Sequence, residues 1–418
     1  MDQARQATGP AHSGVPGAGS ISGVRVLSEA GDFGAPRALH WNHSRITAAP
    51  SSPASAASDG TGLWVIPGLV DTHVHAAWHA FDEADRHQIP PAAQRAATAT
   101  GLARTLAAGI TQVRDAGGLS ADELAALPAA ERPEVQLSVR LLDRAAADAA
   151  GSLDRAVAQV LDAGAEWVKL VATAGVASPA GAGLEPVFSA AEVQGAVARA
   201  ERSGAAVMVH AWGGEAIDHA ISAGAASIEH GIFLTDTQAH AAASAGLTLV
   251  PTLRIYRLVQ RMIAAGALPR AFRARVDEAI GSHPIAVRRA RDAGLPIAVG
   301  TDSGTPDQHG TAALEVDALR EAGLNAQEAL LAATRSGAKL LARVDRDRGR
   351  AQFAGTLAPG APADAVVLTR DPREPGVLAD PAAIVGVLRA GVFRGNPRQS
   401  DALRGVGFVP GVPPPATP

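Results

Sequence analysis

Short β-like runs alternate with alanine-rich helical stretches from Trp64 to about Val344, and this alternation restricts the chain to an α/β fold. The eight expected strands are Trp64–His75, Thr111–Asp115, Val135–Leu141, Trp167–Thr173, Ala206–Ala211, Ala226–His230, Leu247–Pro251 and Pro296–Asp302. Many of the helical stretches between them end in glycine, which is a common stop signal for a helix. Strands that alternate with helices in this way over about 280 residues predict a (β/α)8 TIM barrel.

A doubly wound open sheet is the structural alternative to a barrel. No G-x-G-x-x-G motif follows an early strand, so the sequence offers no support for a dinucleotide-binding fold. We expect the barrel to occupy residues 67–352, with a small β-sandwich domain built from both ends of the chain, 21–66 and 353–407. Residues 1–20 are predicted to be a disordered tail, and the proline-rich residues 408–418 a second loose tail.

The first expected strand ends abruptly in titratable residues, in the stretch PGLVDTHVH (Pro67–His75). Residues two apart on a strand point to the same face, so His73 and His75 lie side by side. Chemistry in a (β/α)8 barrel lies at the C-terminal ends of the strands, where further ligand-type residues stand. These residues are Lys169, His210, His230 and Asp302. Any one of them alone could be a buried polar group, but the set predicts a metal site of nitrogen and oxygen ligands, since the chain has no cysteine.

Lys169 stands inside an apolar strand, where a charged amine is costly to bury. Burial lowers the pKa of a lysine, and a neutral amine can add carbon dioxide to become a carbamate that bridges two cations. Arginine cannot do this, because it stays protonated. In a chain whose basic residues are almost all arginine, Lys169 and Lys339 being the exceptions, a retained lysine favours this chemistry over a salt bridge inside the barrel.

Asp302 closes the last expected strand and completes a catalytic site. A carboxylate at this position can bind a metal and also take the proton of a metal-bound water. Two divalent ions, most simply Zn²⁺, would lower the pKa of a bridging water toward about 7 and polarise a carbonyl oxygen. The sequence therefore predicts metal-assisted hydrolysis of a carbonyl–heteroatom bond by a bridging hydroxide, with Asp302 as general base and then acid, and with Lys169 and His230 beside it.

The composition argues against several classes of partner. The net charge is −4 and no basic cluster is interleaved with aromatic residues, so nucleic acid is not an expected partner. No apolar run approaches the roughly 20 residues that span a bilayer. The first residues lack the apolar core of a signal peptide, and we therefore expect a cytoplasmic protein.

The candidate metal ligands and the stretches around them resemble the motifs of the amidohydrolase superfamily. Within it they resemble the imidazolonepropionase-like group, which includes metal-dependent Xaa-Pro dipeptidases (prolidases) and related carboxypeptidases. The resemblance extends from Leu63 to about Leu368. It rests on PGLVDTHVH (Pro67–His75), GITQVRDAGG (Gly109–Gly118), EWVKLVATAG (Glu166–Gly175), VHAWGGEAIDHAISAGAASIEHG (Val209–Gly231), VPTL (Val250–Leu253), VGTDSGTP (Val299–Pro306) and GTLAPGAPADAVVL (Gly355–Leu368). It implies a binuclear zinc site on His73, His75, carboxylated Lys169, His210, His230 and Asp302, and a small amide or peptide-like substrate. It also gives a homo-oligomer as an expectation.

Three further residues are candidate substrate contacts. Tyr256, the single tyrosine, follows VPTL where some prolidase-like members place a tyrosine that contacts the substrate. His309 resembles a family position near the substrate, and His79 lies in the loop after the first strand. The alternative for each is a surface or loop side chain. The segment Arg140–Ala156 departs from the family pattern, since it lacks the histidine that many prolidase-like members carry there.

Three readings of the function stay open on the sequence. The first is a binuclear hydrolase that cleaves an amide C–N bond in a peptide-like, N-acyl amino acid or lactam substrate. The second is a mononuclear enzyme that resembles imidazolonepropionase or the deaminases, which usually lack a lysine equivalent to Lys169. The third is a non-catalytic binding protein on the same fold. The measured number of zinc ions per chain separates the first two readings.

Overall fold

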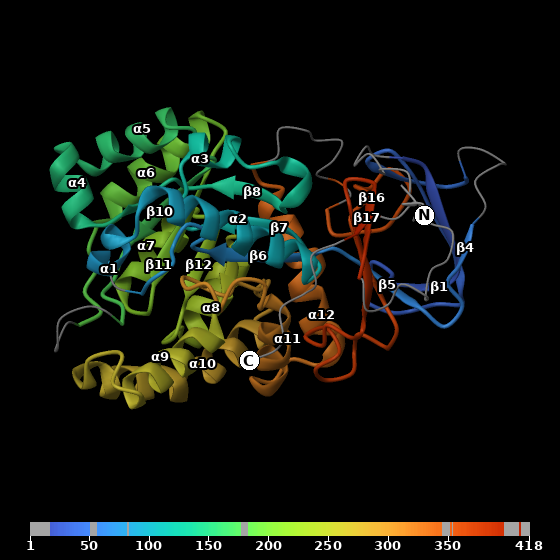
Figure 1. Cartoon of the computed structure of the whole chain (residues 1–418). Helices are drawn as coiled ribbons and strands as arrows, with labels where there is room; N and C mark the ends of the chain where they lie inside the picture. Colours follow the sequence, from blue (N-terminus) through green and yellow to red (C-terminus); the bar gives the residue numbers. More distant parts are fainter. Residues whose placement is uncertain are drawn as a thin grey trace, which may run out of the picture.

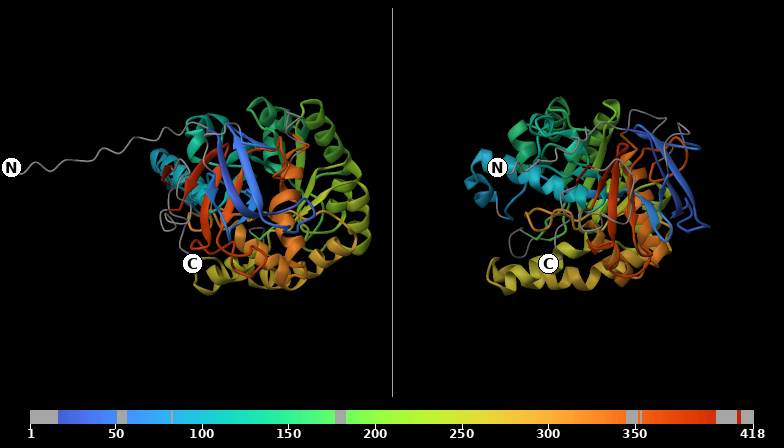
Figure 2. Two further views of the ribbon diagram at one scale, coloured as in Figure 1. Left: turned by 90° about the vertical axis from the view of Figure 1, so that its right-hand side faces the viewer. Right: turned by 45° about the vertical axis from the view of Figure 1, so that its right-hand side comes forward.

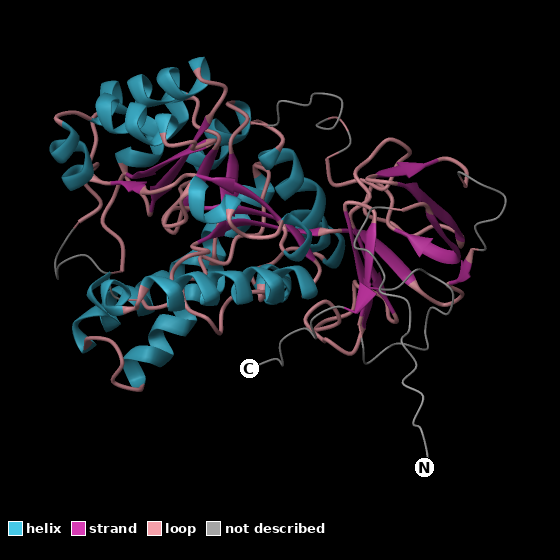
Figure 3. Ribbon diagram, turned by 45° about the horizontal axis from the view of Figure 1, so that its top comes forward, coloured by secondary structure: helices cyan, strands magenta, loops and turns pink. Residues whose placement is uncertain are grey.

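The computed structural model describes residues 17–50, 57–81, 83–176, 183–344, 352, 354–396 and 409–410. Helices pack around parallel strands in one part of the molecule, and a region of strands alone stands beside it (Figures 1 and 3). The predicted disordered tail lies outside the described residues as far as residue 16, and β1 begins at Gly19. Of the proline-rich tail, only residues 409–410 are described. No helix of these ranges is long and apolar enough to cross a membrane.

The helical part contains two sheets of parallel strands, β6-β7-β8 and β9-β10-β11-β12-β13. Their bounds are β6 Leu69–Val74, β7 Ile110–Asp115, β8 Glu134–Leu137, β9 Leu141–Leu142, β10 Trp167–Val171, β11 Ala206–Ala211, β12 Ser227–His230 and β13 Thr248–Val250. The backbone N–H of Glu166, just before β10, donates to the carbonyl of Leu137 in β8 at 2.8 Å. This bond links the two sheets on one side.

Residues 296–303 lie between the two sheets on the other side. The isolated parallel bridges that join this segment to β13 and β6 are Leu249–Ile297 and Val74–Ser303. The N–H of Thr72 donates to the carbonyl of Val299 at 2.9 Å, and the N–H of Asp302 donates to the carbonyl of His73 at 2.7 Å. The expected eighth strand thus occupies a strand position without forming a regular strand. This α/β arrangement is consistent with a (β/α)8 barrel.

The first expected strand is divided in the structure. Residues Trp64–Pro67 form β5, which pairs antiparallel with β14 of the strand-only region, and β6 begins at Leu69. Gly68 separates them, and a Cβ at this position would lie 2.0 Å from the Oγ1 atom of Thr111. The chain therefore passes from one sheet to the other at Gly68, where any side chain would clash with Thr111.

The third expected strand, Val135–Leu141, is also divided. β8 stops at Leu137, and the chain resumes as the short β9. Val139 lies between them with a φ of 65°, in the left-handed region that a β-branched residue rarely adopts. This turn moves Leu141 from the neighbourhood of β7 to that of β10, with which β9 pairs.

The strand-only region is one sheet made from both ends of the chain, in the order β17-β16-β15-β14-β5-β1-β2-β3, with β4 paired to β1. Its remaining strands are β1 Gly19–Val26, β2 Arg37–Asn42, β3 Arg45–Thr47, β4 Ser58–Asp59, β14 Ala365–Leu368, β15 Ile384–Arg389, β16 Val392–Gly395 and β17 Val409–Pro410. A bulge between Ile21 and Val24 interrupts β1. Side chains from both halves share one core, among them Trp41 and Val367. The strands from both ends of the chain are therefore connected through β1 and β5, and the predicted sandwich domain stays a prediction.

Helices follow most of the parallel strands. The main ones are α1 Glu83–Gln88, α2 Pro91–Ala107, α3 Ala121–Ala125, α4 Arg144–Ala150, α5 Leu153–Asp162, α6 Ala190–Arg202, α7 Glu215–Ala223, α8 Asp236–Ser244, α9 Leu253–Ala264, α10 Arg273–Asp292, α11 Ala312–Glu321, α12 Ala326–Leu331 and α13 Gly337–Leu341. Capping boxes begin α3, α6, α8 and α12, at Ser120, Ser189, Thr235 and Asn325. Figure 2 shows the molecule from two further directions; the strand-only sheet faces the viewer in the left view and lies to the right in the right view.

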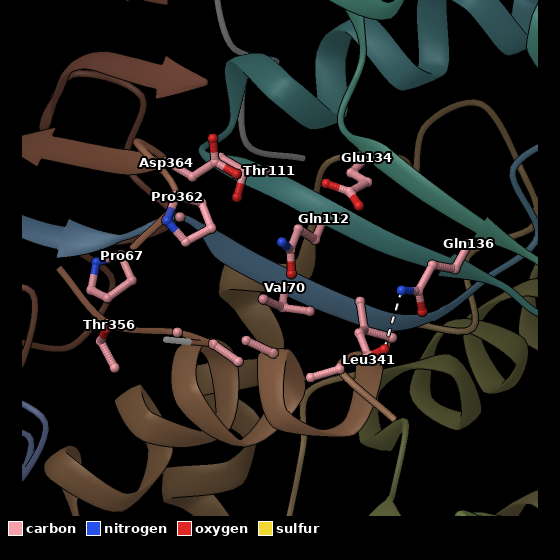
Figure 4. Close-up of a pocket in the computed structure, with 15 residues that line it drawn as sticks. Pro67, Val70, Thr111, Gln112, Glu134, Gln136, Leu341, Thr356, Pro362 and Asp364 are labelled. Carbon is pink, nitrogen blue, oxygen red and sulfur yellow. Dashed lines mark hydrogen bonds between the residues drawn. The ribbon is translucent and has the colours of Figure 1, made fainter. Parts of the chain in front are cut away.

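A small cavity of about 40 Å³ lies where the two parts meet (Figure 4). It is lined by residues at the beginnings of β6, β7 and β8, such as Val70, Thr111 and Glu134. The Gln136 amide donates across it to the carbonyl of Leu341 at 3.1 Å. A space of this size holds a few water molecules. It lies at the opposite ends of these strands from the titratable residues described next.

Candidate active site

The ligand-type residues lie together at the C-terminal ends of the parallel strands and line one cavity of about 340 Å³. They are His73 near the end of β6, His75 directly after it, Lys169 in β10, His210 in β11, His230 at the end of β12 and Asp302 in the segment 296–303. The strands β10, β11 and β12 are neighbours in one sheet, and β6 belongs to the other sheet (Figure 1). Residues from five separate stretches of the chain therefore meet in one place.

Asp302 lies between the two histidines of β6. Its Oδ1 atom is 3.4 Å from His73 Nε2 and 3.3 Å from His75 Nε2. His73, His230 and Asp302 each offer one ligand atom, and these three atoms lie within 4.8 Å of one another. This spacing is suited to a single cation bound among them.

Lys169 and His210 lie next to these three residues. Lys169 is 1% exposed, and its Nζ atom lies 3.2 Å from His73 Nε2. The His210 ring centroid is 4.6 Å from that of His230. The Nε2 atom of His210 is buried and has no hydrogen-bond partner among the described residues. A buried nitrogen without a partner is costly unless it binds something, and a cation would satisfy it.

Burial holds the imidazoles of His73, His210 and His230 in the neutral form that binds metals. Burial, and then the charge of Lys169, lower the pKa of His73 to about 4 and that of His210 to about 3. Burial also places the pKa of His230 well below its usual value. At pH 7 these rings offer nitrogen lone pairs, so the side chains present fit a divalent cation.

Burial also lowers the pKa of Lys169, to about 8, against the opposing charges of Glu229 and Asp302. An appreciable fraction of this amine is therefore neutral near physiological pH. Burial alone would raise the pKa of Asp302, but His73 and His75 lower it to about 2. Asp302 is consequently an ionised carboxylate in the same place as the neutral imidazoles.

The buried ion pair between Glu229 and Arg114 orients His73. The Nδ1 atom of His73 donates to the Glu229 carboxylate at 2.5 Å, which leaves Nε2 directed at the site. Arg114 donates to the same carboxylate at 2.8 Å and to the carbonyl of Thr72 at 2.6 Å. Burial would raise the pKa of Glu229, but Arg114 and His73 lower it to about 2. Glu229 is therefore charged and fixes the tautomer of His73.

The other histidines also have fixed outer partners. His75 donates from Nδ1 to the carbonyl of Gly117 at 2.9 Å, and His230 Nδ1 lies 2.8 Å from the Thr252 hydroxyl. His230 and Asp302 have φ values of 70° and 53°. Non-glycine residues in this left-handed region are uncommon and cluster at functional sites, where the surrounding structure holds them.

Apolar side chains form most of the remaining cavity wall. Trp78 and Phe81, from the segment after β6, line it together with residues from three other elements. The other apolar lining residues are Leu141, Val171, Val176, Trp212, Ile255 and Val259. Burying apolar surface is the main source of affinity in pockets of this kind, so the walls favour a substrate with apolar groups.

Tyr256 lines this cavity and is 2% exposed. Its ring centroid lies 6.2 Å from that of His230, and burial raises its pKa well above the ordinary value. Tyr256 belongs to α9, whose first amides, on Leu253 and Arg254, donate to the buried Glu315 carboxylate at 3.0 Å each. The structure therefore holds a protonated phenol beside the candidate ligands.

His309 and His79 do not line the cavity. His309 is 3% exposed, and its Nε2 atom lies 3.4 Å from the carbonyl of Trp78. His79 contacts the hydroxyl of Thr98 at 3.0 Å, and its ring centroid is 6.0 Å from that of His309. Their contact with substrate therefore stays a prediction.

Arg114 and Glu229 were not among the residues singled out from the sequence. An arginine inside the apolar stretch Ile110–Asp115, and a glutamate directly before His230, were the available signals. Both lie in the recognised motifs, but the partner of a buried charge is identified only when the strands are placed next to each other.

The chain matches the model of the amidohydrolase family over residues 64–395. An uncharacterized protein of Mycobacterium tuberculosis is 31% identical over 82% of this chain and 88% of its own length. The ochratoxinase of Aspergillus niger is 29% identical over 60% of this chain and 50% of that protein. A prolidase solved with N-methylphosphonate-L-proline superposes with a TM-score of 0.81 at 26% identity, over 90% of this chain and 99% of the prolidase.

The match covers the strands that carry the histidines, Lys169 and Asp302, and it extends into the strand-only sheet. Family, relatives and site chemistry agree, and the cluster of histidines and aspartate fits the metal dependence of such enzymes. The chain therefore belongs to the amidohydrolase family and is a hydrolase that acts on carbon–nitrogen bonds.

Proposed function

We propose that this enzyme uses two divalent metal ions, most simply Zn²⁺, to hydrolyse the amide C–N bond of a peptide-like, N-acyl amino acid or lactam substrate. One observation carries the proposal: a buried lysine with a lowered pKa stands among four histidines and an ionised aspartate. The proposed scaffold is a (β/α)8 barrel in which residues 296–303 take the place of the eighth strand.

The proposed ligands are His73, His75, His210, His230, Asp302 and Lys169 as its carbamate. When bound, the cations would lower the pKa of a water toward about 7 and polarise the substrate carbonyl. Lys169, once its neutral amine has added carbon dioxide and lost a proton, would supply a carbamate oxygen ligand to the cations. Asp302 takes the proton of the attacking water and passes it to the leaving nitrogen. Tyr256 donates a hydrogen bond from its phenol to a substrate oxygen.

The relatives and the cavity walls together indicate the substrate class. The names of the similar proteins point to prolyl dipeptides and to ochratoxin as substrates of those enzymes. The cavity has aromatic walls at Trp78, Phe81 and Trp212, and Leu141 lines it in the segment that lacks the histidine of many prolidase-like members. We therefore expect amides with a bulky apolar group to be better substrates than small dipeptides.

A mononuclear enzyme is the second candidate, and the close spacing of His73, His230 and Asp302 favours it. The number of zinc ions per purified chain, measured by plasma mass spectrometry, separates the candidates. About two supports the proposal, and one supports the mononuclear alternative. The cytoplasmic location and the homo-oligomer stay predictions, which fractionation and sedimentation velocity test.

Replacement of Lys169 is the direct test of the bridge. We expect Lys169→Ala to lose zinc and turnover on a panel of N-acyl amino acids, dipeptides, lactams and aromatic amides. Added short-chain carboxylic acids should restore part of the turnover, because they replace the missing anion. Lys339→Ala is the matched control, since the Lys339 side chain is exposed and far along the chain in α13. Full activity of Lys169→Ala without an added acid would contradict the proposal.

A further inference from the structure

Trp78 lies flat against the candidate ligand His75. The two ring centroids are 3.7 Å apart, and the ring planes differ by 8°. The N–H of Trp78 donates to the carbonyl of His75 at 3.0 Å, so a tight turn folds the indole back over the imidazole. The His75 ring is thus fixed at Nδ1 by the carbonyl of Gly117 and on one face by the indole.

Arg86 covers Trp78 from the other side. Its guanidinium carbon lies 3.9 Å from the Trp78 ring centroid, which is the geometry of a cation–π contact. Since an imidazole and a guanidinium in van der Waals contact with one ring cannot share a face, Arg86 and His75 lie on opposite faces of the indole. Arg86 also donates to the carbonyls of Ala80 at 3.2 Å and Phe81 at 2.8 Å, which ties it to the segment that follows Trp78.

Two glycines make room for the edges of the indole. A Cβ on Gly118, after β7, would lie 2.6 Å from Trp78 Nε1, and a Cβ on Gly304, after Asp302, would lie 3.2 Å from Trp78 Cε3. Trp78 therefore contacts the loops that follow two different strands of the site. It also lines the cavity, so a bound substrate would rest against the same ring that supports His75.

We propose that Trp78, clamped by Arg86, is a positioning residue for the metal ligand His75 and at the same time an apolar wall for the substrate. The inference deepens the proposed function and rests on it, because it assigns a role toward the metal and the substrate. Without the indole, the His75 ring can rotate about its side-chain bonds. Metal binding must then order the ring, and the entropy cost of this ordering lowers the affinity for the metal.

The test measures zinc affinity and kinetics on the same set of variants. Zn²⁺ is titrated into the metal-free protein against a chromophoric chelator, and kcat and KM are measured separately on the best amide of the panel. We expect Trp78→Leu to weaken zinc binding about 10- to 100-fold, with a fall in kcat and a rise in KM. Trp78→Phe keeps a stacked ring and should recover most of the zinc affinity.

Arg86→Met provides a second variant that leaves the indole in place, and we expect a smaller loss of zinc affinity in the same direction. Arg95→Met is the matched control, because Arg95 is exposed on α2, and it should behave as the wild type. Wild-type zinc affinity in Trp78→Leu, with a change in KM alone, would overturn the positioning role. Equal losses in Trp78→Phe and Trp78→Leu would overturn it as well. A wild type that binds zinc but cleaves no amide contradicts the proposed function instead, and the zinc titrations still decide the role of Trp78.

Discussion

Arg114 connects the buried charges of the site to the strands around it. It is completely buried, donates to Glu229, to the Ser227 hydroxyl and to the carbonyl of Thr72, and lies over the ring of Trp167 at 4.5 Å. Burial lowers its pKa, and the Glu229 carboxylate opposes this effect. A cation so deep in a protein requires its counter-ion, so we expect the pair to act as one unit.

Removal of the charge of Glu229 should therefore damage both stability and metal binding. We expect Glu229→Gln to lower the free energy of unfolding by about 3–5 kcal/mol, because Arg114 is left without a counter-ion. Zinc affinity should fall about 10- to 100-fold, since the amide no longer holds the His73 tautomer as firmly. Denaturant titration and chelator competition measure the two effects. Glu201→Gln, at the exposed end of α6, is the control, and unchanged zinc affinity in Glu229→Gln would contradict the assignment.

His309 provides a pH-dependent prediction. Burial lowers its pKa to about 4, so the folded protein keeps this ring neutral while the unfolded chain protonates it below about 6.5. The contribution of His309 to stability is therefore intact above pH 6.5 and is lost as the pH falls toward 4, by about 3 kcal/mol in total. We expect His309→Gln to become progressively more stable relative to the wild type over this range. Urea unfolding between pH 7.5 and 4.5 checks this, with the exposed His240→Gln as control, and parallel pH profiles would refute it.

At the scale of single residues, the sequence predicts the candidate metal ligands better than the residues that orient them. His73, His75 and Asp302 stand where strands were expected to end, and side chains at strand ends of a parallel sheet converge. The Arg114–Glu229 pair, by contrast, depends on which strands become neighbours across the sheet. His79 and His309, in the loops after two expected strands, do not line the cavity, and their contact with substrate stays a prediction.

Among the elements, the segment 296–303 packs tightly against both neighbouring strands. A Cβ at Gly300 would lie 2.4 Å from Val250 Cγ1 in β13 and 2.8 Å from His73 Cβ in β6. Gly300 therefore lets this segment pass closely between the two parallel sheets. This close approach places Asp302 beside His73 in β6 and His75 directly after it.

Gly300→Ala tests this close approach. We expect a loss of about 1–3 kcal/mol in stability, because β6 and β13 must move apart. Zinc affinity should fall as His73 is displaced. Gly195→Ala in the middle of α6 is the matched control, since a Cβ there meets nothing within 4 Å, and it should stabilise the helix by about 0.5–1 kcal/mol. A Gly300→Ala protein of normal stability would show that the segment can shift freely.

The order of helices and parallel strands could be predicted because apolar periodicity and glycine stops are local signals. The divided strands could not, because both halves of Trp64–His75 are apolar and periodicity does not reveal which sheet each joins. The segment 296–303 was expected as a strand, and it forms isolated bridges only. Regular pairing depends on neighbours that the local sequence does not specify.

For the whole molecule, the site is a source of stability once it is filled. Buried neutral imidazoles and a nitrogen of His210 without a partner are costs that a bound cation offsets. A ligand that binds the folded state alone adds about 2.7 kcal/mol at a concentration 100 times its dissociation constant. We expect zinc to raise, and chelation to lower, the unfolding temperature of the intact chain.

Differential scanning calorimetry at several zinc concentrations measures this linkage. Asp302→Asn should remove most of the zinc-dependent shift, because the amide is a weaker ligand than the carboxylate. Lys339→Ala should keep the full shift. An unfolding temperature of the wild type that does not respond to zinc would contradict a metal site at these residues.

At the level of the molecule, the sequence predicted a second region made from both ends of the chain. Strands from both ends do pair, through β5 and β14, and their side chains share one core. The division into a barrel and a β-sandwich domain stays a prediction. The sheet is irregular in β1 between Ile21 and Val24, and again where β14 pairs with β15 at Val367 and Leu368. Sequence alternation gives the faces of strands, whereas the position of a bulge depends on long-range pairing.

The passage through Gly68 joins the terminal sheet directly to the strand that presents His73, without any flexible connector. A displacement of the outer sheet would therefore move the candidate ligands His73 and His75, which follow Gly68 within a few residues. A design that reuses this helical part should therefore keep the terminal strands in register, because they hold β6 and the histidine it presents in place.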